Sequence, residues 1–264
     1  MSRPVFIAGV HRSGTSTLHD VLRSHPQLYG LVETGKPMDE GQHCQSLYPT
    51  DEVFGGPGRF AFAPEAAMDE RHSLVSLDNA RQLWATWHKY TIRDGEFFVE
   101  KSPPNIVRTR FLQALFPDAR QIVVLRHPII TAFATVKRWP LAWNGNWMPY
   151  AENALLAYER FTKDRSSLTN VLVIRYEDLL ARESLIMRTI WSFLRIAPVD
   201  GTAYRPERNE LYNLAWDASM AVLPDGGEGI RQWIGIHWGK RLAKFGYSCH
   251  DLREVTPIDW IAGS

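Results

Sequence analysis

The sequence has little of what several protein classes need. Its 264 residues include only two cysteines, Cys44 and Cys249, and their separation matches no metal-ligand spacing. We therefore expect free thiols in a reducing compartment rather than a disulfide framework. The 30 basic and 29 acidic residues leave a net charge of +1, so no broad basic field favours binding to nucleic acid or a membrane surface.

Long hydrophobic runs are missing as well. The apolar run near the N-terminus, "PVFIAGV", is about six residues long, too short for a signal-peptide core or a membrane span. Low-complexity tracts are absent, and 45% of the residues are hydrophobic, which is enough for a sizeable core. The sequence predicts a single cytoplasmic domain over residues 1–264 without membrane insertion, and it does not reveal the oligomeric state.

Apolar runs and helical patterns alternate along the chain. Runs such as "IVVL" and "VLVI" lack in-out alternation, which is typical of strands covered by helices on both faces. Strands are expected at 4–10, 96–101, 121–126 and 170–176, and helices from about 16 and at 73–92, 105–115, 127–138, 149–166, 178–195 and 237–245. This order predicts an α/β fold, a P-loop-like doubly wound parallel sheet flanked by helices.

Two segments interrupt the alternation. Residues 33–64 are rich in Gly, Pro and charge, which predicts an irregular surface loop that acts as a lid. Residues 196–229 also contain Pro and Gly, and we expect weaker order there. Gly246 follows the last expected helix and is a candidate C-cap, because glycine tolerates the left-handed conformation that ends many helices.

The stretch "GVHRSGTST", residues 9–17, has the glycine spacing of a phosphate-binding loop. A loop between a strand and a helix presents free backbone N–H groups and the positive end of the helix dipole to an anion. The lysine of nucleoside-triphosphatase loops is absent, since Thr15 and Ser16 stand in its place, whereas Arg12 precedes the glycine. The strands "IVVL" and "VLVI" end in Arg126 and Arg175, not in a magnesium-binding acid. The pattern indicates an anion bound without metal, although a turn that merely caps a helix has the same residues.

Four segments together resemble the 3′-phosphoadenosine 5′-phosphosulfate-dependent sulfotransferases, most closely the tyrosylprotein type. They are "VFIAGVHRSGTSTLHDVLRSHPQLYGLVETGK", "EKSPPNIVRTRFLQALFPDARQIVVLRHP", "VIRYEDLL" and "LAKFGYS", and "DEGQHCQ" looks like a bacterial branch. The resemblance implies metal-independent, in-line transfer of a sulfuryl group to an acceptor hydroxyl, with adenosine 3′,5′-bisphosphate as product. It implies that Glu33 is the base, that Lys101 is the catalytic lysine and that Arg126 binds the 3′-phosphate. It also implies a 5′-phosphosulfate loop made of Arg12, Ser13, Gly14, Thr15, Ser16 and Thr17.

Departures from the family leave parts of the site open. The usual serine after the 3′-phosphate arginine is Ala134 here, and Thr135 or Thr131 is the candidate substitute. The glycine-rich segment that closes over the nucleotide in cytosolic members is missing. In its place, "EGIRQWIGIHWGKR" offers three candidate phosphate ligands, Arg231, Lys240 and Arg241.

The acceptor site is the least defined part of the prediction. His43 is a rival base, because cytosolic members use histidine. Trp139, Trp143 and Trp147 recur at three- to four-residue spacing and either belong to the core or line an acceptor pocket. The acceptor itself, a small molecule or a peptide hydroxyl, stays open. Two alternative functions also remain, a kinase-like P-loop phosphotransferase that uses ATP and a non-catalytic nucleotide-binding protein.

Overall fold

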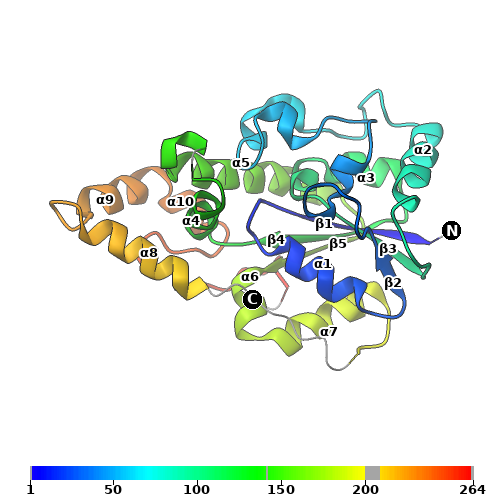
Figure 1. The fold of residues 1–264 in the computed structure, drawn as a ribbon. Coiled ribbons are helices and arrows are strands. Elements are labelled where there is room, and N and C mark those ends of the chain that lie inside the picture. The colour runs from blue at the N-terminus through cyan, green and yellow to red at the C-terminus, as the bar shows by residue number, and fades with distance from the viewer. Residues whose placement is uncertain (1, 141, 200–208, 263–264) are drawn as a thin grey trace.

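A computed structural model describes residues 2–140, 142–199 and 209–262. In this part of the chain, parallel strands form a five-stranded sheet in the order β2-β3-β1-β4-β5 (Figure 1). The strands are β1 (Arg3–Gly9), β2 (Leu28–Gly30), β3 (Phe97–Lys101), β4 (Arg120–Leu125) and β5 (Val171–Arg175). The predicted α/β class and parallel sheet are confirmed.

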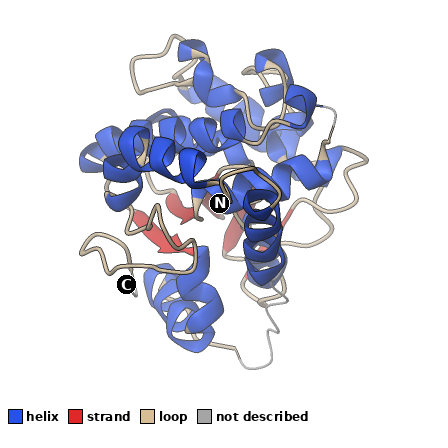
Figure 2. Ribbon diagram, turned by 90° about the vertical axis from the view of Figure 1, so that its left-hand side faces the viewer, coloured by secondary structure: helices blue, strands red, loops and turns tan. Residues whose placement is uncertain are grey.

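Helices cover both faces of the sheet (Figures 1 and 2). One face carries α1 (Thr15–Arg23), α6 (Tyr176–Ala181) and α7 (Glu183–Leu194). The other carries α2 (Leu77–His88), α3 (Thr109–Leu115), α4 (Pro128–Arg138) and α5 (Met148–Asp164). At one end of the molecule, beside α4, lie α8 (Asn209–Ala221), α9 (Glu228–His237) and α10 (Gly239–Ala243).

The central strands are buried on both sides, as their unbroken apolar runs predict. In β1, Val5 and Ile7 pack against side chains of α1 and α7 on one face of the sheet. Phe6 and Ala8 pack into the hydrophobic clusters on the other face. All four side chains are fully buried. A strand with helices on both faces therefore has no solvent side on which polar residues would alternate.

The strand order places a crevice at the carboxyl end of β1. The chain builds β2 and β3 on one side of β1 and then crosses to build β4 and β5 on the other. In parallel α/β sheets, ligands bind where this switch in direction occurs, outside the carboxyl ends of the strands. The segments that follow β1, β3 and β4 begin with Val10, Ser102 and Arg126, and all three therefore start at this edge.

Some elements differ from the sequence prediction. The short strand β2 was not predicted, because three residues are too few for a hydrophobic period. The helix expected at 178–195 is two helices, α6 and α7, which meet at Arg182. The expectation of weak order over 196–229 was wrong where α8 and α9 form, while residues 200–208 lie outside the described residues. Gly246 has the expected left-handed conformation, with φ 76°.

The predicted lid loop is a chain of short turns and not a featureless coil. Single 3₁₀ turns occur at Pro37–Asp39, Gly41–Cys44, Asp51–Phe54, Phe60–Phe62 and Pro64–Ala66. Several side chains of this segment are buried, including Gln42 and Phe60 at 0% exposure. The segment is thus packed onto the domain. Among the described residues, no helix is long and apolar enough to cross a membrane.

Candidate active site

The loop between β1 and α1 has a backbone suited to an anion. Gly14 precedes α1 with φ 97°, and Arg12 also has a left-handed φ of 66°. The backbone N–H of Ser13 donates to the carbonyl of Val10 at 3.1 Å, which closes the turn. The N–H groups of the first turn of α1 have no carbonyl partner within the helix, so they are available to a bound anion.

Gly9 is needed where this loop leaves the sheet. A Cβ atom at this position would lie 2.5 Å from the Ser13 Oγ and 2.8 Å from the Val124 carbonyl oxygen. Neither atom sits at the end of a long flexible side chain, so a larger residue would displace the loop. Glycine therefore lets the loop fold back tightly over the end of β4.

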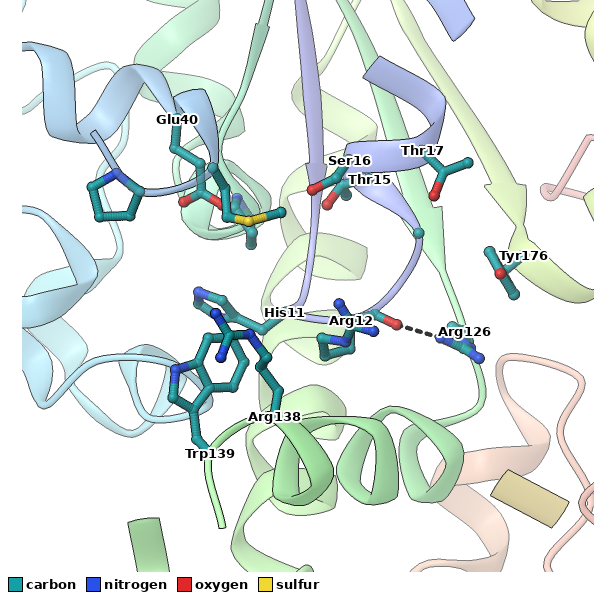
Figure 3. A pocket seen from close by; sticks show the side chains of 14 residues that line it. His11, Arg12, Thr15, Ser16, Thr17, Glu40, Arg126, Arg138, Trp139 and Tyr176 are labelled. Atoms are coloured by element: carbon teal, nitrogen blue, oxygen red, sulfur yellow. Dashed lines mark hydrogen bonds between the residues drawn. The ribbon is translucent and has the colours of Figure 1, made fainter. Parts of the chain in front are cut away.

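A cavity of about 280 Å³ lies against the loop (Figure 3). It is lined by His11, Arg12, Gly14, Thr15, Ser16, Thr17, Pro37, Met38, Glu40, Pro103, Arg126, Arg138, Trp139 and Tyr176. Figure 3 shows two ends on opposite sides of the loop. We call the side with Arg126 and Tyr176 the Arg126 end, and the side with His11, Arg138 and Trp139 the Trp139 end.

Arg126 follows β4 and is held from several directions. Its Nε and Nη2 both donate to the Asn209 Oδ1, at 2.9 and 2.6 Å, and its Nη1 donates to the Arg12 carbonyl at 2.6 Å. The guanidinium lies over the ring of Tyr176, 4.3 Å from its centroid. These contacts fix a planar cation against the phosphate-type loop, as a phosphate-binding arginine requires.

Lys101, the last residue of β3, is completely buried. Its Nζ donates to the Glu40 Oε1 at 2.9 Å and to the Met38 carbonyl at 3.1 Å. Met38 and Glu40 line the cavity and Lys101 does not. The segment after Pro37 therefore covers the predicted catalytic lysine in this structure, and the lysine must shed or share these partners to reach a ligand.

A second buried carboxylate holds that covering segment in place. Glu100 Oε1 accepts from the backbone N–H of Gly41 at 3.0 Å and from the Ser102 hydroxyl at 2.6 Å, and its Oε2 accepts from Asn105 Nδ2 at 2.6 Å. Burial outweighs these hydrogen bonds and raises the pKa of Glu100 from its ordinary 4.5 to about 7. A Cβ at Gly41 would lie 2.5 Å from this carboxyl group, so the close approach needs glycine.

Glu33, the base implied by the resemblance, is not among the cavity-lining residues. Its side chain is exposed, and its backbone has a left-handed φ of 49°. The carboxylate that lines the cavity, within the part of the chain that the structure describes, is Glu40, which sequence reasoning did not select. Glu40 belongs to the "DEGQHCQ" block that the resemblance includes, but nothing in the local sequence distinguishes Glu40 from the neighbouring acid Asp39.

His43, the rival base, lies near two carboxylates, Glu40 and Asp51, and does not line the cavity. Its Nε2 is 3.8 Å from the Glu40 Oε2 and 3.7 Å from the Asp51 Oδ1. Asp51 also pairs with His11, whose Nε2 is 3.0 Å from the Asp51 Oδ2. Burial pushes the pKa of Asp51 upward, but the hydrogen bond and charge of His11 outweigh it, so the pKa lies below its ordinary value. His11 lines the Trp139 end, and it too was missed from the sequence.

The remaining predicted site residues divide between the cavity and other places. Of the tryptophans, Trp139 lines the cavity. Trp143 instead packs against Arg59 and Phe62, and Trp147 packs against Phe133, Trp216 and Trp238. The structure also does not bring Thr131, Thr135, Arg231, Lys240 or Arg241 to the cavity lining.

Each of those polar residues has a different environment. Thr135 is buried in α4 and donates to the Thr131 carbonyl at 2.6 Å, so it is bonded within its own helix. Arg231 donates to the Gly226 carbonyl at 2.7 Å, and Lys240 is exposed. Arg241 pairs with Glu152 and Glu159. Tyr176, which sequence reasoning missed, had a usable signal, because it directly follows the carboxyl end of β5.

A metal requirement is not indicated by any grouping of side chains. Within residues 2–140, 142–199 and 209–262, no three His, Cys, Asp or Glu side chains are arranged so that they could hold a metal ion. Metal-independent transfer stays a prediction.

Comparisons with known proteins agree with the resemblance. Protein-tyrosine sulfotransferase 1 of Danio rerio is 22% identical over 247 residues, which cover 88% of this chain and 65% of the relative. A solved sulfotransferase from Alicyclobacillus acidocaldarius has a TM-score of 0.50 at 18% identity and covers 92% of this chain and 94% of its own. A sulfotransferase from Mycobacterium avium has a TM-score of 0.51 at 15% identity, with 96% and 72% covered.

The structural likenesses concern the fold, since their identities are low. The match at the level of the family extends further, because the model of the sulfotransferase family matches residues 4–200, which include the loop, Glu33, Lys101 and Arg126. The resemblance predicted from the sequence is thereby confirmed. The chain belongs to the sulfotransferase family.

Proposed function

We propose that this protein transfers a sulfuryl group from 3′-phosphoadenosine 5′-phosphosulfate to the hydroxyl group of an acceptor. The observation that carries the proposal is the cavity in which the first turn of α1, Arg12 and Arg126 all face the same space. The family match supports the reaction class. The chain spans 65% of the length of its Danio rerio relative, so the activity is proposed from this site and not transferred from that protein.

The residues present fit the nucleotide that the family implies. Loop amides, three hydroxyl side chains and two guanidinium groups surround one space, because Arg12, Gly14, Thr15, Ser16, Thr17 and Arg126 all line the cavity, and this donor set suits an anion. The loop residues Arg12 to Thr17 would hold the 5′-phosphosulfate. Arg126 would hold the 3′-phosphate at the opposite side of the loop. The bound nucleotide supplies the activated sulfuryl group.

The proposed roles of the side chains follow from where charge changes during an in-line displacement. Negative charge builds on the leaving phosphate oxygen, so a cation there lowers the barrier, and Lys101 is the candidate. The amides of the loop and Arg12 would donate to the equatorial oxygens of the sulfuryl group. Because the nucleotide occupies the Arg126 end, the acceptor hydroxyl approaches from the Trp139 end.

A base must remove the proton of the attacking hydroxyl, and two carboxylates are candidates. Glu33 is the residue implied by the resemblance and would have to turn inward from its exposed position. Glu40 already lines the cavity, and its contact with Lys101 joins the candidate base to the candidate cation. We propose that one of these two carboxylates is the base. His43 comes third, because it neither lines the cavity nor is the base that the resemblance implies.

The alternative functions remain distinguishable by ligand binding. The kinase-like reading finds no support in the family match. A thermal-shift titration should show stabilisation by adenosine 3′,5′-bisphosphate that is insensitive to chelator. Adenosine 5′-monophosphate, which lacks the 3′-phosphate, is the matched control and should shift the melting temperature less. A shift produced only by ATP with magnesium would overturn the proposal, and bisphosphate binding without turnover on any acceptor would favour a non-catalytic protein.

A further inference from the structure

The Trp139 end of the cavity carries a cation that the nucleotide does not need. Arg126 and the loop account for the two anionic ends of the proposed donor, and Lys101 accounts for the leaving oxygen. Arg138, the last residue of α4, also lines the cavity, but at the opposite end from Arg126 (Figure 3). Its guanidinium is therefore available to something other than the nucleotide phosphates.

Arg138 has no acidic partner among the described residues. The salt bridges of this part of the chain pair other surface arginines, such as Arg241 with Glu152, but do not include Arg138. Among the residues that the structure describes, Glu40 is the one carboxylate that lines the cavity, and it is engaged by Lys101 at 2.9 Å and by Gln42 Nε2 at 2.7 Å. The positive charge of Arg138 is thus not neutralised locally, and a ligand anion can meet it without displacing an internal pair.

Aromatic surface lies directly beside that charge. The Arg138 guanidinium carbon lies 5.5 Å from the centroid of the Trp139 ring, and the His11 ring meets the same indole edge-on at 6.0 Å. A planar ring of a ligand can pack in such a setting, because aromatic pairs favour edge-to-face and offset contacts. One end of the cavity therefore combines a flat apolar surface with a cation, Arg138, that has no acidic partner in the described part of the chain.

We infer that the acceptor is a small hydroxylated aromatic compound that carries a carboxylate. Its ring would pack against Trp139, its carboxylate would pair with Arg138, and its hydroxyl would face the sulfuryl group at the loop. Arginine suits this role because its planar fork matches a carboxylate with two parallel hydrogen bonds. This inference rests on the proposed function, since it names the substrate class of the same site.

Three phenols that differ only in the charge of one side chain test the inference. They are 4-hydroxyphenylacetate, which is anionic, 4-hydroxyphenylethanol, which is neutral, and tyramine, which is cationic. Their dissociation constants are measured by calorimetry on the protein saturated with adenosine 3′,5′-bisphosphate, and their kcat/KM values with the sulfated donor. The anionic phenol should bind about tenfold more tightly than the neutral one, the scale of one charge-assisted contact. The cationic phenol should bind most weakly.

The variant Arg138→Gln should abolish that preference while leaving the affinity for the bisphosphate unchanged. Lys137→Gln is the matched control, because Lys137 precedes Arg138 on the same helix but does not line the cavity, and it should keep the preference. Equal binding of the three phenols, failure of all three to bind, or a preference that survives Arg138→Gln would overturn the inference alone. Failure of the bisphosphate itself to bind would instead overturn the proposed function on which the inference depends.

Discussion

The two ends of the cavity are built in different ways. At the Arg126 end, the ligand-facing groups are mostly backbone amides and an arginine fixed by Asn209 and the Arg12 carbonyl. At the Trp139 end, they are the side chains of His11, from the loop after β1, and of Arg138 and Trp139, at the end of α4. The first construction is set by the turn from strand to helix, so it follows from local sequence. The second depends on long side chains and loop packing, where substrate choice can vary.

Backbone conformation shows the same contrast. Within the described loop between β1 and α1, one non-glycine residue, Arg12, has a left-handed φ. The segment that leads to Glu40 has three such residues, Glu33, Met38 and Asp39, with φ between 49° and 54°. Non-glycine residues in this region cost on the order of 1 kcal/mol each. The covering segment therefore stores strain that its contacts with Lys101 and Glu100 offset, and a ligand that replaces those contacts can release it.

The largest effect is expected from the lysine that lies beneath this segment. Lys101→Met should lower kcat by about a hundredfold to a thousandfold, because it removes the cation proposed for the leaving oxygen. Lys36→Met, which changes an exposed lysine of the same segment, should leave kcat unchanged. Stopped assays of sulfated product give kcat, and thermal stabilisation by the bisphosphate shows that the variant is folded. A fall of less than tenfold in a folded variant would remove Lys101 from the mechanism.

The second largest effect separates the two candidate bases. Whichever of Glu33 and Glu40 removes the proton, its change to Gln should lower kcat by at least about a hundredfold, the scale of a general base. The change at the other position should cost much less. Glu52→Gln is the control, since Glu52 is an exposed carboxylate of the same loop. The pH profile of kcat/KM adds an independent check, because the acidic limb should vanish only in the variant that lacks the base. If both variants keep full turnover, His43→Ala becomes the next test.

The smallest expected effect concerns stability and the buried carboxyl group that anchors the covering segment. The pKa of Glu100 is about 7 in the folded protein and ordinarily 4.5, so the unfolded chain releases this proton first as pH rises. Its contribution to the free energy of unfolding is therefore fully present below pH 4.5, declines between 4.5 and about 7, and is then constant.

Glu100→Gln should remove this decline, which is on the order of 3 kcal/mol for the shift from 4.5 to about 7. Urea unfolding of the wild type and the variant gives the free energy of unfolding at each pH between 4.5 and 8. The decline then appears as a difference between the two proteins in the slope of this free energy against pH. After correction for the constant cost of altering three hydrogen bonds, the two curves should coincide near pH 4.5 and diverge up to about pH 7, because only the wild type loses stability there. Parallel curves across the whole window would show that Glu100 titrates normally in the folded protein.

The sequence predicts the Arg126 end well because that end is local. Gly14 with the helical spacing after it defines the loop, and Arg126 is placed beside it by the simple rule that parallel strands end at one edge. The same rule places Lys101 at this edge, although not the segment that covers it. These residues need no knowledge of distant packing. The parallel sheet itself can be predicted in the same way from the apolar runs. The three-residue strand β2 was not predicted, because it is too short to show a pattern.

The Trp139 end and the segment that covers Lys101 could not be predicted to the same extent. Glu40 reaches the cavity because the next residue, Gly41, is bonded to Glu100, which is 59 positions away in the chain. No periodicity reports such a contact. Among the tryptophans, spacing alone cannot separate Trp139 from Trp143 and Trp147, because α4 ends at Arg138 and the chain then leaves helical geometry. The helices α8 and α9 were missed because Pro and Gly nearby mask their short apolar stripes.

One contact described above links the cavity to the far end of the molecule. Asn209 begins α8 and places its side-chain oxygen on the Nε and Nη2 of Arg126, where a phosphate would bind. A phosphate that takes this fork must displace Asn209. The helix α8 packs against α4 through the Trp216 and Phe133 rings, 5.9 Å apart, so we expect displacement of Asn209 to change the exchange protection of a helix outside the cavity. Backbone amide hydrogen exchange in α8 would then report whether the nucleotide site is filled.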